Sequence, residues 1–250
     1  LSYTASALSF ALRNLSVPVV FTGGNRPISD LSSDARQNIV FASMVATMDL
    51  AEVAVVYGRK ILRGNCSKKE SESYASAFTA TSSHGKIGDV HRTIALYEQR
   101  IVRRKRNLLF KPNFNGNVIV IKAVPGLDVR AYECMMDALD GVIIEGYGPG
   151  HVPESDKVWM QFIERLNFAG KPVVMTSQMY KSEVNLHAYQ QGERLLKSGV
   201  IPAGEMTLEC TYAKLLWCLG QNMKLPKIRE TMMTNLAREM STEKEAIEVW

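Results

Sequence analysis

Three short segments of the sequence combine glycine with side chains that can carry out acid–base chemistry. Thr22-Gly23-Gly24 follows an apolar stretch, a glycine cluster at residues 146–150 runs into His151, and Lys68-Lys69 lies in a polar, serine-rich stretch. Glycine lets a ligand approach the backbone closely, and lysine or histidine can transfer protons. Adjacent lysines are more typical of a solvated surface, whereas a histidine beside three glycines is reachable by a ligand. The segments mark candidate ligand contacts without defining a reaction.

The spacing of these residues argues against several familiar sites. The G-x-G-x-x-G dinucleotide fingerprint would need its third glycine at the position of His151, and no glycine loop ends in the G-K-[ST] of a phosphate loop. No serine nucleophile elbow and no H-E-x-x-H metal helix occurs. The four cysteines lack C-x-x-C pairs. We therefore expect neither a metal ion nor an organic cofactor.

The elements that must position these residues alternate regularly in the first part of the chain. Strands are predicted at 17–22 and 53–57, and the first ends at the Thr22-Gly23-Gly24 turn. A first helix has Ala5, Leu8, Ser9 and Leu12 on one face. A second, capped by Ser32-Ser33-Asp34, has Ala35, Ile39, Ala42 and Ala46 inward. Residues 58–90 are predicted to form a long polar loop, and 111–117 a domain boundary.

The same alternation of strands and helices begins again after this boundary. Strands are predicted at 118–123, 142–145 and 172–176, and two helices close the chain at about 207–218 and 226–239. The intervening helices carry Tyr132, Met135, Met136 and Leu139 in one case and Trp159, Phe162, Ile163 and Leu166 in the other. Alternation of this kind predicts parallel sheets covered by helices, with ligands at the carboxyl ends of the strands.

Composition places few further limits on function. The 250 residues are 46% hydrophobic with a formal net charge of +5, as in an ordinary globular protein. No apolar run approaches the roughly 20 residues that span a bilayer, so we expect no membrane partner and a cytoplasmic location. One basic run contains Arg103, Arg104, Lys105 and Arg106, and we interpret it as a solvated linker rather than a tRNA contact.

Many motifs, in the right order along nearly the whole chain, resemble the asparaginase/glutaminase family. They are the opening Leu1 to Phe10, the turn from Val20 to Arg26, Ser32-Ser33-Asp34-Ala35, Arg63-Gly64-Asn65 with Lys69, Ala77-Phe78, Pro125-Gly126, the run from Glu145 to Val152, Thr176-Ser177-Gln178 and Glu205-Met206-Thr207. The resemblance implies two three-layer α/β domains with parallel sheets. We expect residues 1–112 to be the remainder of an N-terminal domain truncated at its start, and 113–250 to be the C-terminal domain.

The resemblance also implies a reaction and roles for three residues. In the family, a threonine nucleophile activated by an Asp, Lys and Thr set releases ammonia from a side-chain amide through an acyl-enzyme. Lys69 matches the family lysine, which would hold a proton-transfer partner and stabilise the charged intermediate. Gly24 matches the turn whose backbone borders the substrate amide. His151 matches a position that reaches a neighbouring subunit's site, which implies a homodimer at least.

Two branches of the family are similar, and they imply different substrates. One is the asparaginase-like subunit of archaeal-type glutamyl-tRNA(Gln) amidotransferase, a glutaminase that works with a tRNA-binding transamidase subunit. The other is the cytoplasmic type I L-asparaginase. His151, the segment Ser29–Asp34 and the tail from Val200 to Asn235 look closer to the amidotransferase branch.

The family's threonine and aspartate residues should precede the position of Leu1. We therefore expect the sequence to be a fragment of a longer amidohydrolase and, as given, inactive. A non-catalytic homologue that keeps only an interaction surface is the remaining alternative.

Overall fold

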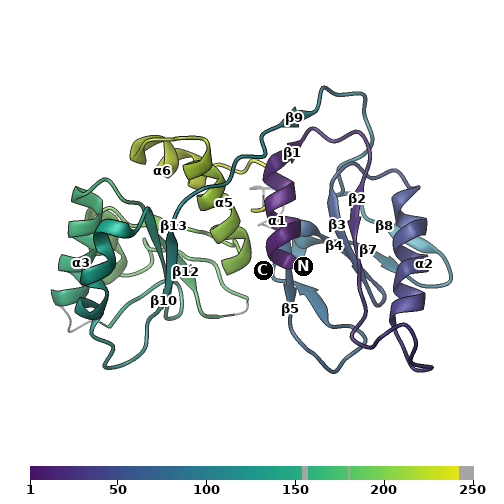
Figure 1. Cartoon of the computed structure of the whole chain (residues 1–250), viewed down its shortest axis with the longest axis horizontal. Helices are drawn as coiled ribbons and strands as arrows, with labels where there is room; N and C mark the ends of the chain where they lie inside the picture. The colour runs from purple at the N-terminus through teal and green to yellow at the C-terminus, as the bar shows by residue number, and fades with distance from the viewer. Residues whose placement is uncertain (154–156, 180, 242–250) are drawn as a thin grey trace. The chain divides into compact units, whose positions relative to one another are not determined.

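The computed structural model describes residues 1–153, 157–179 and 181–241. Contacts divide the described residues into two units: residues 1–112 together with the tail 237–241 form unit 1, and residues 113–236 form unit 2 (Figure 1). The sequence predicts domains at 1–112 and 113–250, which would place this tail in the second domain. In the structure, the Asn65 side chain donates to the Ala237 carbonyl within unit 1.

Unit 1 is built on a five-stranded sheet. Its elements are α1 (Ser2–Ala11), β1 (Leu12–Arg13), β2 (Val19–Phe21), α2 (Ala35–Ala46), β3 (Val53–Tyr57), β4 (Lys60–Arg63), η1 (Gly64–Cys66), β5 (Ser67–Lys69), β6 (Phe78–Ala80), η2 (Ser83–Gly85), β7 (Lys86–Val90), β8 (Ile94–Leu96) and β9 (Leu109–Phe110). The sheet order is β2-β3-β4-β7-β8, in which β2 and β3 are parallel and the other pairs antiparallel. Short antiparallel pairs β1-β9 and β5-β6 complete the unit.

The interior strand β3 is buried on both faces because helices cover both sides of the sheet. Ala54 and Val56 pack with Ala42 and Val45 of α2 on one face. The alternate residues Val53, Val55 and Tyr57 pack with Ala5 of α1 on the other face. A continuous apolar run is what such a strand requires, and the predicted strand 53–57 is confirmed.

Three details predicted for unit 1 were wrong. Its sheet is mixed rather than parallel, because β2 and β3 run in the same direction whereas the other neighbouring strands are antiparallel. Residues 58–90 are not a loop: they form β4, β5, β6 and β7, whose strands of three to five residues are too short and too polar for a clear sequence pattern. In α2, Ile39 is 47% exposed, whereas Asn38 is buried. The helix is turned so that the Asn38 amide can bond to Gly23, Asp34 and Gly58.

Unit 2 is built on a four-stranded, fully parallel sheet in the order β10-β11-β12-β13. Its elements are β10 (Val118–Lys122), η3 (Val129–Ala138), β11 (Gly141–Gly146), α3 (Lys157–Phe168), β12 (Val173–Ser177), α4 (Gln190–Lys197), β13 (Ile201–Pro202), α5 (Leu208–Gly220) and α6 (Leu225–Met233). The predicted strands and the α/β class are confirmed. The helix predicted to carry Tyr132, Met135, Met136 and Leu139 is the 3-10 helix η3, which ends one residue before Leu139. The last helix ends at Met233 rather than 239.

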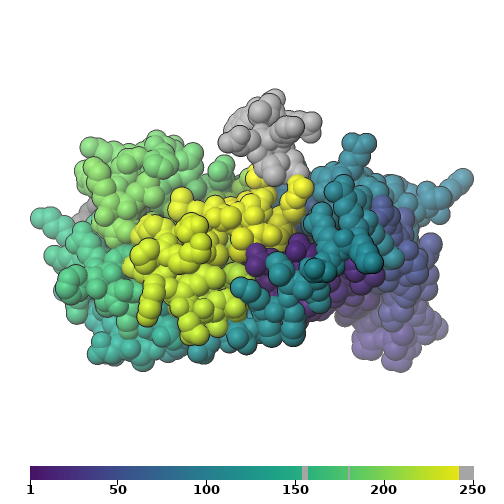
Figure 2. Space-filling model, turned by 90° about the horizontal axis from the view of Figure 1, so that it is seen from above, coloured from purple at the N-terminus to yellow at the C-terminus, as the bar shows by residue number. Residues whose placement is uncertain are grey.

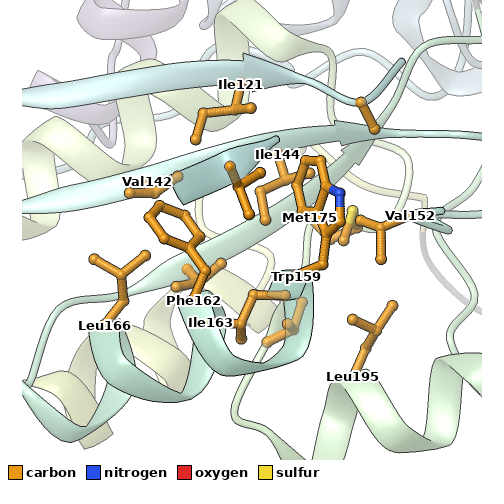
Figure 3. Close-up of a cluster of buried hydrophobic side chains, with 14 of the residues drawn as sticks. Ile121, Val142, Ile144, Val152, Trp159, Phe162, Ile163, Leu166, Met175 and Leu195 are labelled. Carbon is orange, nitrogen blue, oxygen red and sulfur yellow. The ribbon is translucent and has the colours of Figure 1, made fainter. Parts of the chain in front are cut away.

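The core of unit 2 lies between α3 and the sheet. Trp159, Phe162, Ile163 and Leu166 are fully buried against strand residues that include Val142 (Figure 3). This is the helix face that the sequence predicts. Gly170, with φ at +74°, ends the segment after α3. α5 also contacts β11 and β12, the two inner strands of the sheet. Helices therefore pack against both faces of these strands.

The basic run lies on a surface segment of unit 1. Residues 103–110 are exposed, and Figure 2 shows this teal part of the chain on the surface. Arg103 is tied to the end of α2 through the Ala46 carbonyl, and its amide donates to Asp49. None of the helices in the described residues is both long and apolar enough to span a lipid bilayer.

Candidate active site

The turn that contains Gly24 begins where β2 ends. Thr22 donates its hydroxyl to the Val56 carbonyl at 2.7 Å, which ties the turn to the neighbouring parallel strand β3. A Cβ on Gly24 would lie 2.6 Å from the Cβ of Ala35. Only glycine therefore allows the turn to pack this closely against the start of α2. The Gly24 backbone is thereby held at the carboxyl end of the parallel pair, where ligands usually bind.

Asp34 holds this turn in place. Its carboxylate accepts hydrogen bonds from the Asn25 amide at 2.9 and 3.1 Å and from the Arg26 amide at 3.2 Å. Burial works to raise the pKa of Asp34, but these amide hydrogen bonds outweigh it, and the pKa lies below its usual value. From the sequence, Asp34 was assigned to a helix cap and to a family motif, but not to a contact with the Gly24 turn. The structure shows no side-chain cap from it, because the carboxylate faces the turn.

Asn38 and Tyr57 complete the polar cluster around the turn. The Asn38 side chain donates to the Gly23 carbonyl at 2.9 Å and accepts from the Gly58 amide at 3.0 Å. The Tyr57 hydroxyl donates to Asn25 Oδ1 at 2.9 Å. Burial and the nearby Asp34 carboxylate hold the pKa of Tyr57 well above its usual value, so this hydroxyl remains a donor at neutral pH. Sequence reasoning missed both residues, although Asp34 and Asn38 have the spacing of neighbours on one helix face.

Lys69 lies at the end of the short hairpin β5-β6, opposite Phe78. Its Nζ forms an ion pair with Glu72 at 2.8 Å, and its side chain is 37% exposed. An ion pair this exposed stabilises the fold little, so the ammonium group is able to exchange Glu72 for another partner. Lys68 precedes it on the same strand, and alternation along the strand directs the two side chains to opposite faces.

A buried ion pair supports the strand that leads to this hairpin. Arg63, at the end of β4, is 1% exposed and contacts Glu52 at 2.6 Å through Nε. Its other nitrogens donate to the carbonyls of His84 and Gln99 at 2.8 and 2.9 Å. Arg63 thus joins three segments of unit 1 and fixes the backbone six residues before Lys69.

His151 lies in unit 2, in the tight turn after β11. The Tyr147 amide donates to the His151 carbonyl at 2.7 Å, and the imidazole meets the ring of Tyr189 edge-on at 5.2 Å. The adjoining strand β12 supports the turn, because the Ser177 hydroxyl donates to the Gly148 carbonyl at 2.7 Å. Two predicted sheet-edge segments, 145–151 and 176–178, therefore lie side by side in unit 2.

The structure thus brings the segments of Gly24 and Lys69 together in unit 1 through Asn25, Tyr57 and Phe78. It places His151 in the other unit. No cluster of three or more His, Cys, Asp or Glu side chains suited to a metal ion occurs among the described residues. Unit 1 therefore offers a lysine side chain on a hairpin that is linked by contacts to an ordered backbone turn.

Two domain families match the chain, one over each unit. Residues 1–102 match "Asparaginase, N-terminal", and residues 117–232 match "Glutaminase/Asparaginase C-terminal domain". Both matches confirm the resemblance that the sequence motifs indicated.

Individual relatives have two different names. An L-asparaginase from Thermococcus kodakarensis is 36% identical over 246 residues, which cover 96% of this chain and 73% of that protein. A glutamyl-tRNA(Gln) amidotransferase subunit from the same organism is 36% identical over 251 residues, covering 96% of this chain and 56% of the relative. The corresponding amidotransferase subunit of Pyrococcus abyssi is 35% identical, with 57% of its length covered. The chain therefore spans little more than half of these two amidotransferase subunits.

Solved structures show the same fold. The thermostable L-asparaginase from Thermococcus kodakarensis superposes with a TM-score of 0.90 at 35% identity, over 97% of this chain and 74% of that one. L-asparaginase I from Vibrio cholerae gives a TM-score of 0.88 at 28% identity, over 96% and 73% of the two chains.

Proposed function

The chain belongs to the asparaginase/glutaminase family of amidohydrolases, and on this premise we propose that the protein hydrolyses the side-chain amide of glutamine. The ammonia would serve the amidation of Glu-tRNA(Gln) by a partner subunit. The observation that carries the proposal is the contact network in unit 1 that links the Gly24 turn to the hairpin of Lys69.

The proposed reaction has two steps. A threonine hydroxyl, the nucleophile that the family resemblance implies, attacks the amide carbonyl carbon, and the C–N bond breaks to leave an acyl-enzyme and ammonia. Water then attacks the ester, which releases the free acid and restores the hydroxyl. Lys69 would hold the proton-transfer partner and stabilise the negative charge of each tetrahedral intermediate, while the Gly24 backbone would accept from the substrate amide.

The choice of glutamine rests on features shared with the amidotransferase branch. The glycine turn after β11 ends in His151, where asparaginases usually have asparagine. The segment Ser29–Asp34 and the tail from Val200 to Asn235 also look closer to the amidotransferase branch. A transamidase subunit that binds tRNA would then be the partner, and the location would be cytoplasmic. Because the family builds each site across two subunits, we propose a homodimer in which His151 reaches the neighbouring site.

A second candidate is a type I L-asparaginase that acts on free asparagine. The specific observation in its favour is coverage: the chain spans 73% of the L-asparaginase from Thermococcus kodakarensis but 56% of the amidotransferase subunit from the same organism. This candidate uses the same residues in the same roles, and differs in the length of the amide substrate and in needing no tRNA-binding partner.

The test is ammonia release by the full-length protein from glutamine and from asparagine, each with and without the tRNA-binding subunit and Glu-tRNA(Gln). We expect glutamine to be hydrolysed, and the partner to increase the rate. Efficient hydrolysis of asparagine without the partner would favour the second candidate. Release of ammonia from neither amide would contradict both and leave a non-catalytic interaction protein.

A further inference from the structure

The Asn25 side chain is a bridge between two parts of unit 1 that are far apart in sequence. Its Oδ1 accepts the Tyr57 hydroxyl at 2.9 Å, and its Nδ2 donates to the Tyr74 carbonyl at 2.8 Å. A primary amide has one acceptor and one donor end, and both ends are used here. Asn25 therefore ties the turn after β2 to β3 and to the segment that joins β5 to β6.

On one side, the bridge acts together with Asp34 to hold the Gly24 carbonyl in one direction. Gly24 and Asn25 share one peptide plane, so the direction of the Asn25 N–H fixes the direction of the Gly24 C=O. That N–H is held by both carboxylate oxygens of Asp34, at 2.9 and 3.1 Å. The side chain of Asn25 is held as well, so the peptide cannot rotate without breaking contacts at both ends.

On the other side, the bridge holds the hairpin that carries Lys69. The Tyr57 ring packs against Phe78, the strand partner of Lys69, with ring centroids 4.9 Å apart. A Cβ on Gly58 would lie 2.8 Å from the Ala75 carbonyl oxygen, so the segment rests directly on the backbone that follows β3. Glu72, the ion-pair partner of Lys69, belongs to the same segment.

Most other contacts of the segment are local or exposed: the amides of Ser73 and Tyr74 donate to the Ser71 hydroxyl, and Glu72 pairs with Lys69. Residues 72–76 are all exposed, and Tyr74 itself is 73% exposed. A segment without buried apolar side chains opens at low free-energy cost, so single hydrogen bonds strongly affect its position. The hydrogen bond from Asn25 to the Tyr74 carbonyl therefore strongly affects the positions of Glu72 and Lys69 relative to the Gly24 turn.

We propose that Asn25 and Tyr57 are positioning residues that clamp the Lys69 hairpin against the Gly24 turn. The assignment rests on the proposed function of that site as an amide hydrolase. The clamp sets the alignment of the lysine with the substrate amide, so its loss lowers the rate of the chemical step more than it weakens substrate binding. A misplacement of about 1 Å costs up to about a hundredfold in rate.

Two variants of the full-length protein test the clamp, Tyr57→Phe and Asn25→Ala. The first removes only the hydroxyl, and the second removes the bridge. Tyr97→Phe is the control, because the Tyr97 hydroxyl likewise donates to a side-chain oxygen in unit 1, in this case the Asp89 carboxylate, away from the turn. We expect kcat for amide hydrolysis to fall about tenfold or more in both clamp variants, with KM changed by less than about threefold. The control should keep wild-type values.

Hydrogen exchange of the backbone amides of residues 72–76 is a second readout that does not depend on activity. We expect exchange at least about fivefold faster in both clamp variants than in the wild type and Tyr97→Phe. Unchanged exchange in the clamp variants overturns the clamp even if the wild type proves inactive. Unchanged kcat in an active protein overturns the positioning role. An inactive wild type with faster exchange in the variants contradicts the proposed function and leaves the clamp standing.

Discussion

The Asn25 side-chain amide donates to the Tyr74 carbonyl at 2.8 Å, across 49 residues of sequence. This one bond joins the turn of Gly24 to the segment next to Lys69. Gly24 and Lys69 both stand out in the sequence, but nothing in their spacing indicates a link.

The Asp34 carboxylate gives the turn a pH dependence that can be measured. Its pKa is lowered in the folded protein, so its contribution to stability is fully present above the ordinary aspartate value of about 3.9 and is lost as pH falls through the lowered pKa. We expect Asp34→Asn to reduce the free energy of unfolding by about 1 kcal/mol at pH 7, as loss of a partly exposed charged hydrogen bond does.

Urea unfolding at pH 7, 5 and 3 checks this prediction. The difference between Asp34→Asn and the wild type should be the same at pH 7 and 5 and should shrink at pH 3. Asp137→Asn, at an exposed position, serves as the control for a lost surface charge. A difference that stays constant down to pH 3 would mean that the ionised carboxylate does not stabilise the turn.

The buried pair of Arg63 and Glu52 should be among the most sensitive positions of unit 1. Arg63→Met leaves the Glu52 carboxylate buried without its charged partner, which costs about 3 to 5 kcal/mol. Lys227→Met breaks an exposed pair with Glu230 and should cost less than about 1 kcal/mol. Thermal unfolding followed by circular dichroism compares the two, and equal effects would show that the Arg63 pair is not isolated from solvent.

Some of the fold could be predicted because its signals are local. Trp159, Phe162, Ile163 and Leu166 recur with the helical period, and the structure buries all of them. The run 53–57 indicated a buried strand for a similar reason. The hairpin β5-β6 could not be predicted, because its strands have only three residues each and pair through backbone groups that any sequence supplies.

The site could be predicted only in part, because many of its contacts join residues that are far apart in sequence. Gly24 and Lys69 were found because they lie in motifs of the family. Asp34 looked like a helix cap, since the partners that its carboxylate prefers, the amides of Asn25 and Arg26, lie nine and eight residues away. Asn38 could not be identified because the apolar residues of α2 are compatible with two rotations of the helix against the sheet, which differ by one residue.

The core of unit 2 offers a prediction that is independent of the site. Trp159 is fully buried against the sheet, so Trp159→Ala should lower the free energy of unfolding of unit 2 by about 3 to 5 kcal/mol. Phe168 lies at the end of the same helix and is 97% exposed, so Phe168→Ala should have almost no effect. Denaturant unfolding of both variants tests this, and comparable losses would contradict the placement of α3.

The most direct test of the proposed activity is the rate of ammonia release by Lys69→Met in the full-length protein, with Lys68→Met as the matched control on the same strand. We predict that Lys69→Met lowers kcat for amide hydrolysis at least about a hundredfold, while Lys68→Met keeps nearly the wild-type rate. Near-normal turnover by Lys69→Met, or an equal loss in both variants, would contradict the role of Lys69.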